Sequence, residues 1–114
     1  MENYTKLKRP SMFAPPSASM NMGYSNSHGS SCEMYTSACV TELMNAATSF
    51  HKLHLKVTGT GSYAAHKALN ELYDALPGHA DDLAEGYQGA AEKLLSYEEK
   101  TPKILNSVEE ALSY

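Results

Sequence analysis

Five residues between His54 and Glu85 are of types that bind metal ions, and they are regularly spaced. His54 and His66 lie twelve positions apart on either side of a glycine-containing turn, and Asn70 follows His66 by four. Asp81 and Glu85 form a second pair four positions apart. Residues four apart on a helix share one face, and helical bundles hold metals with such pairs. The pattern therefore indicates a site of imidazole and oxygen ligands, suited to iron or another transition metal.

Helix geometry limits how these residues can act together. Asn70 and Asp81 share a helix face, but they lie about 16 Å apart along the axis of one continuous helix. A single metal ion cannot bridge that distance. Asp81 and Glu85 therefore either serve a separate site or face the histidines of a second subunit across a twofold axis, which would create two equivalent sites.

The sequence before this stretch predicts a first helix over 31–57. Ser30 followed by Glu33 is a capping-box signature for its start. Its apolar positions recur at steps of four and three residues, and they are Cys39, Leu43, Ala46, Phe50, Leu53 and Val57. Gly59 is expected in the left-handed conformation just after the helix.

A second helix is predicted over 62–99, with Thr60 or Ser62 as its cap. Pro77 lies near its middle, where proline normally breaks a helix. The apolar positions nevertheless keep their phase through it, which favours one kinked helix over two separate helices. These positions are Leu69, Leu72, Leu76, Ala80, Leu83, Tyr87, Ala90, Leu94 and Tyr97.

A short third helix is predicted from Thr101 as N-cap and Pro102 as first residue to Tyr114. No strand pattern or phosphate-binding glycine loop occurs in the sequence. The predicted fold class is all-α, and residues 31–114 are predicted to form the helical domain. It consists of a long antiparallel hairpin, with the second helix kinked at Pro77, and a short C-terminal helix. So small a domain has a marginal core, so we expect homo-oligomerisation to complete a four-helix bundle.

Composition and charge narrow the other possibilities. Residues 1–30 have no period and are predicted to form an extended arm that contacts a neighbouring subunit or a larger assembly. The net charge of −4 gives no general case for nucleic-acid binding, and three basic residues in the arm support it only weakly. Cys32 and Cys39 are expected to be small core residues in a reducing compartment. No stretch is long and apolar enough for a membrane span, so a cytoplasmic protein is expected, or alternatively part of a virus particle.

The spacing of the five residues resembles that of Dps-like proteins, the mini-ferritins of the ferritin-like superfamily. In that family a histidine ends the first helix, a second follows twelve residues later with an acid four beyond it, and an Asp and a Glu lie further along the second helix. The matching positions here are His54, His66, Asn70 in place of the acid, Asp81 and Glu85, and the turn sequence KVTG is also similar. The resemblance implies an iron site shared by two subunits, oxidation of Fe(II), and mineral storage in a hollow shell.

The chain also departs from the family pattern. Asn70 is a neutral, weaker ligand than the carboxylate it replaces, and Leu55 stands where the family has an aromatic residue. The predicted helices make only half of the family's four-helix subunit. Two functions are therefore carried forward: an iron-binding protein with possible ferroxidase activity, and a non-enzymatic structural or assembly protein, such as a virion component, with a vestigial site. Short Dps-like chains of this kind resemble phage-encoded proteins.

Overall fold

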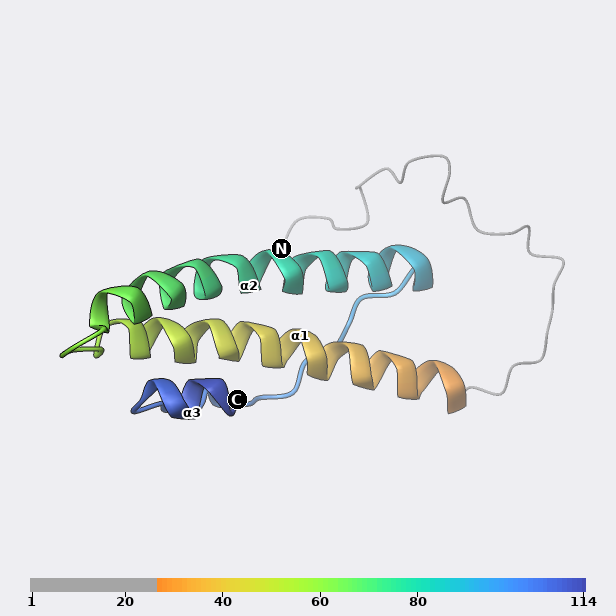
Figure 1. Cartoon of the computed structure of the whole chain (residues 1–114). Coiled ribbons are helices and arrows are strands. Elements are labelled where there is room, and N and C mark those ends of the chain that lie inside the picture. The colour runs from red at the N-terminus through yellow and green to blue at the C-terminus, as the bar shows by residue number, and fades with distance from the viewer. Residues whose placement is uncertain (1–26) are drawn as a thin grey trace, which may run out of the picture.

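Two long antiparallel helices form the body of the molecule. The computed structural model describes residues 27–114, with α1 at Ser27–His54, α2 at Ser62–Ala91 and α3 at Val108–Leu112. Figure 1 shows α1 and α2 side by side and α3 next to α1. No strand occurs among the described residues. The predicted all-α class and the helical hairpin are thus confirmed. Except for its last four residues, the predicted arm lies outside the described part of the chain.

α1 begins earlier than the sequence predicted. Because its first residue is Ser27, Ser30 lies inside the helix, and the predicted N-cap is wrong. Glu33 instead pairs with the ammonium group of Lys93, which follows α2. At the other end α1 stops at His54, three residues before the predicted end at 57, and the amide of Val57 donates to the carbonyl of Leu53 in the turn that follows.

α2 passes through Pro77 without ending, as the unbroken phase predicted. Its cap is Gly61, with φ +78° and no side-chain cap bond, so the predicted capping by Thr60 or Ser62 is wrong. Gly59, with φ +89°, has the left-handed conformation expected of it. These two positive φ values turn the chain tightly between the helices, in a conformation that glycine adopts without strain.

α2 ends at Ala91 and not at the predicted residue 99. The pairing of the helices supplies the reason: Val40 of α1 packs with Ala80 of α2, and this register places the start of α1 level with the end of α2. A longer α2 would extend beyond its partner and leave its apolar side uncovered. The chain turns back instead, and the amide of Leu95 donates to Oε1 of Gln88 at 3.0 Å.

Residues 92–107, called the strap below, cross the hairpin without regular structure. The predicted helix start at Thr101 and Pro102 is therefore wrong. Extended backbone advances about 3.3 Å per residue against 1.5 Å for a helix, so the short strap can reach from Leu95 in one core cluster to Leu105 in the other. α3 is instead capped by Ser107, whose Oγ accepts from the amide of Glu110 at 3.2 Å. The Glu110 carboxylate in turn accepts from the amide of Asn106, the residue before the cap, at 2.8 Å.

The core consists of two clusters along the hairpin. The cluster near the turn contains Ala46, Phe50, Leu53, Leu69 and Leu105, and the other contains Val40, Ala80, Ala84 and Leu95. Several positions of the predicted core are instead exposed, so these assignments are wrong. They are Cys32, Cys39, Leu72 at 41%, Leu83 at 37%, Ala90, Leu94 at 55% and Tyr97 at 52%. The apolar arc of α2 is wider than α1 and the strap can cover. No helix among residues 27–114 is long and apolar enough to cross a membrane.

Polar contacts of Glu42 hold the strap and the C-terminal residue against α1. Its carboxylate accepts from the ammonium of Lys100 and from the hydroxyl of Tyr114, the latter at 2.8 Å. Asn45 donates to the carbonyl of Lys100 at 2.9 Å. The Lys100 and Tyr114 bonds lower the pKa of Glu42, whereas burial and the bond to Glu42 raise the pKa of Tyr114 to about 12.

The raised pKa of Tyr114 predicts a loss of stability at high pH. Between about pH 10 and about pH 12 the unfolded chain releases this proton while the folded chain keeps it, so the free energy of unfolding falls as the pH rises. At about pH 9, urea unfolding should give a higher midpoint for the native chain than for Tyr114→Phe. As the pH rises toward about 12, the midpoint of the native chain should fall toward that of Tyr114→Phe. Parallel curves for the two proteins would contradict this assignment.

Candidate functional site

The two predicted histidine ligands come together at the turn end of the hairpin. His54, the last residue of α1, is buried, and His66, in the second turn of α2, is exposed. Their rings stack with centroids 3.6 Å apart and planes at 28°. Nδ1 of His54 lies 2.9 Å from the carbonyl oxygen of His66, and Nδ1 of His66 lies 3.2 Å from the carbonyl oxygen of His54.

This reciprocal bonding determines which ring nitrogens can bind a ligand. A carbonyl oxygen only accepts hydrogen bonds, so Nδ1 of both His54 and His66 must carry a proton. In the neutral rings Nε2 then holds the free lone pair. A histidine that ligates a metal typically donates its other N–H to a carbonyl or carboxylate, which fixes the tautomer and the ring orientation. The Nδ1–carbonyl hydrogen bonds of His54 and His66 are therefore of the kind that ligating histidines make.

Asn70 lies close to this pair but is engaged by its own helix. Its Oδ1 accepts from the hydroxyl of Tyr73 at 2.7 Å, and its Nδ2 donates to Asp74 at 3.0 Å. The Tyr73 ring in turn meets the edge of the His54 ring, with centroids 5.2 Å apart. These bonds fit Asn70 better as a residue that positions Tyr73 beside the histidines than as a ligand in its own right.

His51 also belongs to this group of rings, although the sequence pattern gave it no role. Its ring stacks on Tyr73 with centroids 3.9 Å apart and planes at 11°. The spacing of His51 and His54, three residues apart on α1, is the one signal in the sequence that places them on one face. No such signal identified Tyr73 as the residue that joins His51 to Asn70.

Asp81 and Glu85 lie on exposed positions of α2, 15 and 19 residues beyond His66 and so well away from the His54–His66 pair of the same chain. Within residues 27–114 no three His, Cys, Asp or Glu side chains gather closely enough to hold a metal ion. A complete site formed by all five predicted residues therefore requires a second chain, and this arrangement stays a prediction.

A shallow groove lies between the histidine pair and these acids. It is lined from α1 by Met44, Ala47, Thr48 and His51 and from α2 by Tyr73, Asp74 and Pro77. By helix rotation of about 100° per residue, Asn70, Pro77 and Asp81 point in similar directions, so the histidines, the groove and the acids share one face of the hairpin. We call it the metal face.

Comparison with family models, with curated proteins and with solved structures finds no match to this chain. Its function is therefore inferred from its own residues.

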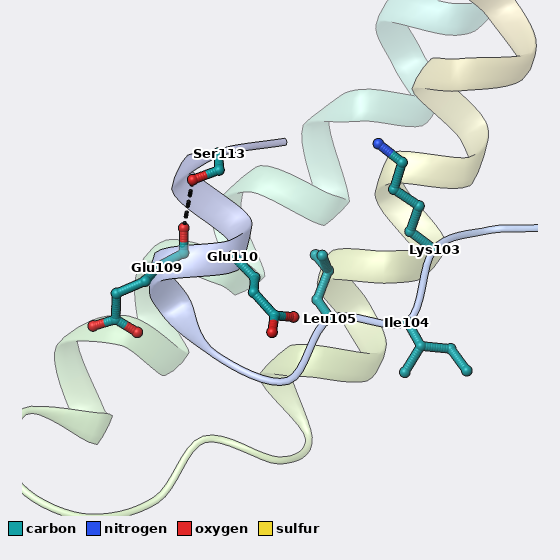
Figure 2. Close-up of a pocket in the computed structure, with 6 residues that line it drawn as sticks. All are labelled: Lys103, Ile104, Leu105, Glu109, Glu110 and Ser113. Carbon is teal, nitrogen blue, oxygen red and sulfur yellow. Dashed lines mark hydrogen bonds between the residues drawn. The ribbon is translucent and has the colours of Figure 1, made fainter.

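A second hollow, beside α3, has no comparable set of ligands. Figure 2 shows Leu105 directed toward the hairpin, Ile104 directed away from it, and the carboxylates of Glu109 and Glu110 pointing in different directions. The nearby Ser113 hydroxyl is bonded to the carbonyl of Glu109 at 3.0 Å. The metal face is thus the better candidate site.

Proposed function

We propose that two copies of this chain pair through the metal face and bind Fe(II) between them, in the manner of a Dps-like protein. His54 and His66 of one chain would supply Nε2 ligands, and Asp81 and Glu85 of the other would supply carboxylates. The stacked imidazoles support this proposal most strongly, because both Nδ1 atoms bond to carbonyls and both Nε2 atoms keep a lone pair.

The spacing along α2 has the symmetry that such a pairing requires. The midpoint of His66 and Glu85 along the sequence falls between positions 75 and 76, and the midpoint of Asn70 and Asp81 falls at the same place. A twofold axis through that point, with the two α2 helices antiparallel, brings each histidine end level with the acidic end of the other chain. The pairing of Val40 with Ala80 places Met44 of α1 level with position 76, so Met44, which is 48% exposed, would lie next to the axis.

The donor set suits Fe(II) as a substrate. Two imidazoles and two carboxylates carry a total charge of −2, which offsets the charge of the metal ion and favours the Fe(III) product further. With hydrogen peroxide as oxidant, two Fe(II) ions each lose one electron and one peroxide is reduced to water with uptake of two protons. Asn70 adds no charge, so we expect weaker binding than with a carboxylate at that position.

A complementation experiment tests the shared site. His54→Ala/His66→Ala keeps the acids, and Asp81→Ala/Glu85→Ala keeps the histidines, so neither variant alone should bind Fe(II) or oxidise it with peroxide. When equal amounts are refolded together, half of the dimers are mixed and each has one intact site, so about a quarter of the native sites should return. Iron bound per chain and the rate of iron oxidation are the measurements.

The matched control is Glu98→Ala/Glu99→Ala, which removes the same charge from exposed residues beyond α2. It should bind and oxidise iron as the native chain does. Recovery of no activity in the mixture, or native activity in either parent variant, would contradict a site shared between chains.

A structural role is the second candidate, and the exposed leucines of α2 favour it. Leu72 and Leu83 are apolar residues of a size suited to helix packing, yet the described chain leaves them uncovered. In this role the hairpin would be an assembly module, and the arm before Ser27 would contact a neighbouring subunit. Deletion of residues 1–26 should then prevent assembly, while substitution of both histidines should leave assembly intact, as measured by sedimentation velocity.

A further inference from the structure

An apolar seam runs along α2 on the side opposite the metal face. Its eight positions follow one another at steps of three or four residues, contain no Asp, Glu, Lys or Arg, and are exposed except for the half-buried Ala65. They are Ala65, Ala68, Leu72, Ala75, His79, Leu83, Gly86 and Ala90. We call this set the outer seam. It spans about 38 Å of helix and lies beside the buried positions of α2, so its exposure widens the apolar arc of this helix beyond what the hairpin covers.

The order of large and small residues in the outer seam is nearly the same in both directions. Leu72 and Leu83 are centred between positions 77 and 78, and so are Ala65 and Ala90. The other two pairs, Ala68 with Gly86 and Ala75 with His79, are centred on position 77, and His79 is the one polar residue of the eight. An interface between two identical chains related by a twofold axis needs this property. If residue i of the first chain contacts residue j of the second, then residue j of the first chain also contacts residue i of the second.

We propose that a second copy of this chain packs its outer seam against the first, with the two α2 helices antiparallel. Leu72 of each copy then lies opposite Leu83 of the other, and the small residues at both ends allow the helix backbones to approach closely. The two hairpins together form a four-helix arrangement. This contact is separate from the metal face, because Leu72 and Leu83 point about 180° away from Asp81 and Glu85 around the axis of α2.

The available area predicts a reversible contact. A strip about 38 Å long and about 10 Å wide on each copy gives a total of about 800 Å², below the 1,200 Å² or more of stable complexes. Glu71 and Asp82 each precede a seam leucine by one residue, and the antiparallel pairing brings Glu71 of one copy near Asp82 of the other. Salt screens this repulsion between carboxylates, so association through the outer seam should strengthen as ionic strength rises.

Disulfide trapping of the full chain tests the pairing and its direction. Cys32 and Cys39 are first replaced by serine, and Leu72→Cys, Leu83→Cys and the double variant are then oxidised with oxidised glutathione. The double variant should form covalent dimers on denaturing gels. Neither single variant should, because like positions lie about 16 Å apart in the antiparallel pair. An equimolar mixture of the two single variants should form the mixed covalent dimer, and the yields should rise with salt.

Efficient dimerisation of either single variant would overturn the antiparallel arrangement, and absence of dimers in the double variant would overturn the contact itself. Both leucines are partly exposed, so the variants are expected to keep native far-UV circular dichroism, which is recorded for each. The same trapping in a Met44→Glu background separates the two interfaces. Undiminished dimer yield there supports a contact independent of the metal face, and loss of the dimer would overturn that independence.

Discussion

Replacement of Met44 by glutamate is expected to abolish iron binding while leaving the hairpin folded. Met44 is 48% exposed and makes no contribution to the buried clusters, so a charged side chain is tolerated in the single chain. In the pair formed through the metal face, the two new carboxylates would meet beside the twofold axis. Like charges brought together at an interface cost several kcal/mol, and a cost of about 4 kcal/mol weakens the pairing about a thousandfold.

Iron bound per chain, measured by anaerobic equilibrium dialysis, is the appropriate readout for this variant. It does not depend on whether chains also associate through the outer seam. Leu112→Glu is the control, because Leu112 is 84% exposed on α3 and does not belong to the metal face. Native iron binding by Met44→Glu would contradict the proposed axis, whereas loss of binding in both variants would show that an added negative charge is itself the cause.

Replacement of Leu53 by alanine is expected to have the largest effect on stability. Leu53 is 1% exposed and lies in the core cluster with Phe50, Leu69 and Leu105. Removal of a buried leucine side chain costs the transfer free energy of its methyl groups and leaves a cavity, in total about 3 kcal/mol. For a small domain with a total stability of about 5 kcal/mol, this is more than half of the free energy of unfolding.

Urea unfolding followed by far-UV circular dichroism measures the effect of Leu53→Ala. Leu55→Ala is the control, because Leu55 is 72% exposed just beyond the end of α1 and its loss should change stability by less than about 0.5 kcal/mol. Since Leu53 precedes His54 directly, the variant should also weaken the alignment of the stacked imidazoles. Equal unfolding midpoints for the two variants would show that the cluster at the turn contributes little to stability.

The two proposed contacts have a joint consequence for assembly. The metal face and the outer seam lie on opposite sides of α2, so one chain can bind two others at once. A chain that pairs through both faces would form assemblies larger than dimers, and iron should increase their size by strengthening one of the two contacts. Sedimentation velocity with and without Fe(II) should therefore show a shift to larger species in the native chain and none in Met44→Glu.

Much of the local structure follows from the sequence. The apolar steps of three and four residues identify both long helices, the unbroken phase predicts that α2 continues through Pro77, and Gly59 has the positive φ expected of it. The spacing of His54 and His66 across a tight turn also placed the two rings near each other. These features depend on residues close together in the chain, so periodicity and turn chemistry are sufficient to predict them.

Other features depend on segments that are distant in the sequence, and only the tertiary structure decided them. Periodicity shows which way the apolar face of a helix points, but not how much of that face the neighbouring segments cover. It therefore predicts Leu72 and Leu83 in the core, whereas α1 and the strap leave both exposed. The strap itself is extended because its two buried leucines must reach separate core clusters. Carbonyl groups across the turn likewise determine which ring nitrogen of His54 and His66 carries the proton. The residue spacing alone does not reveal this.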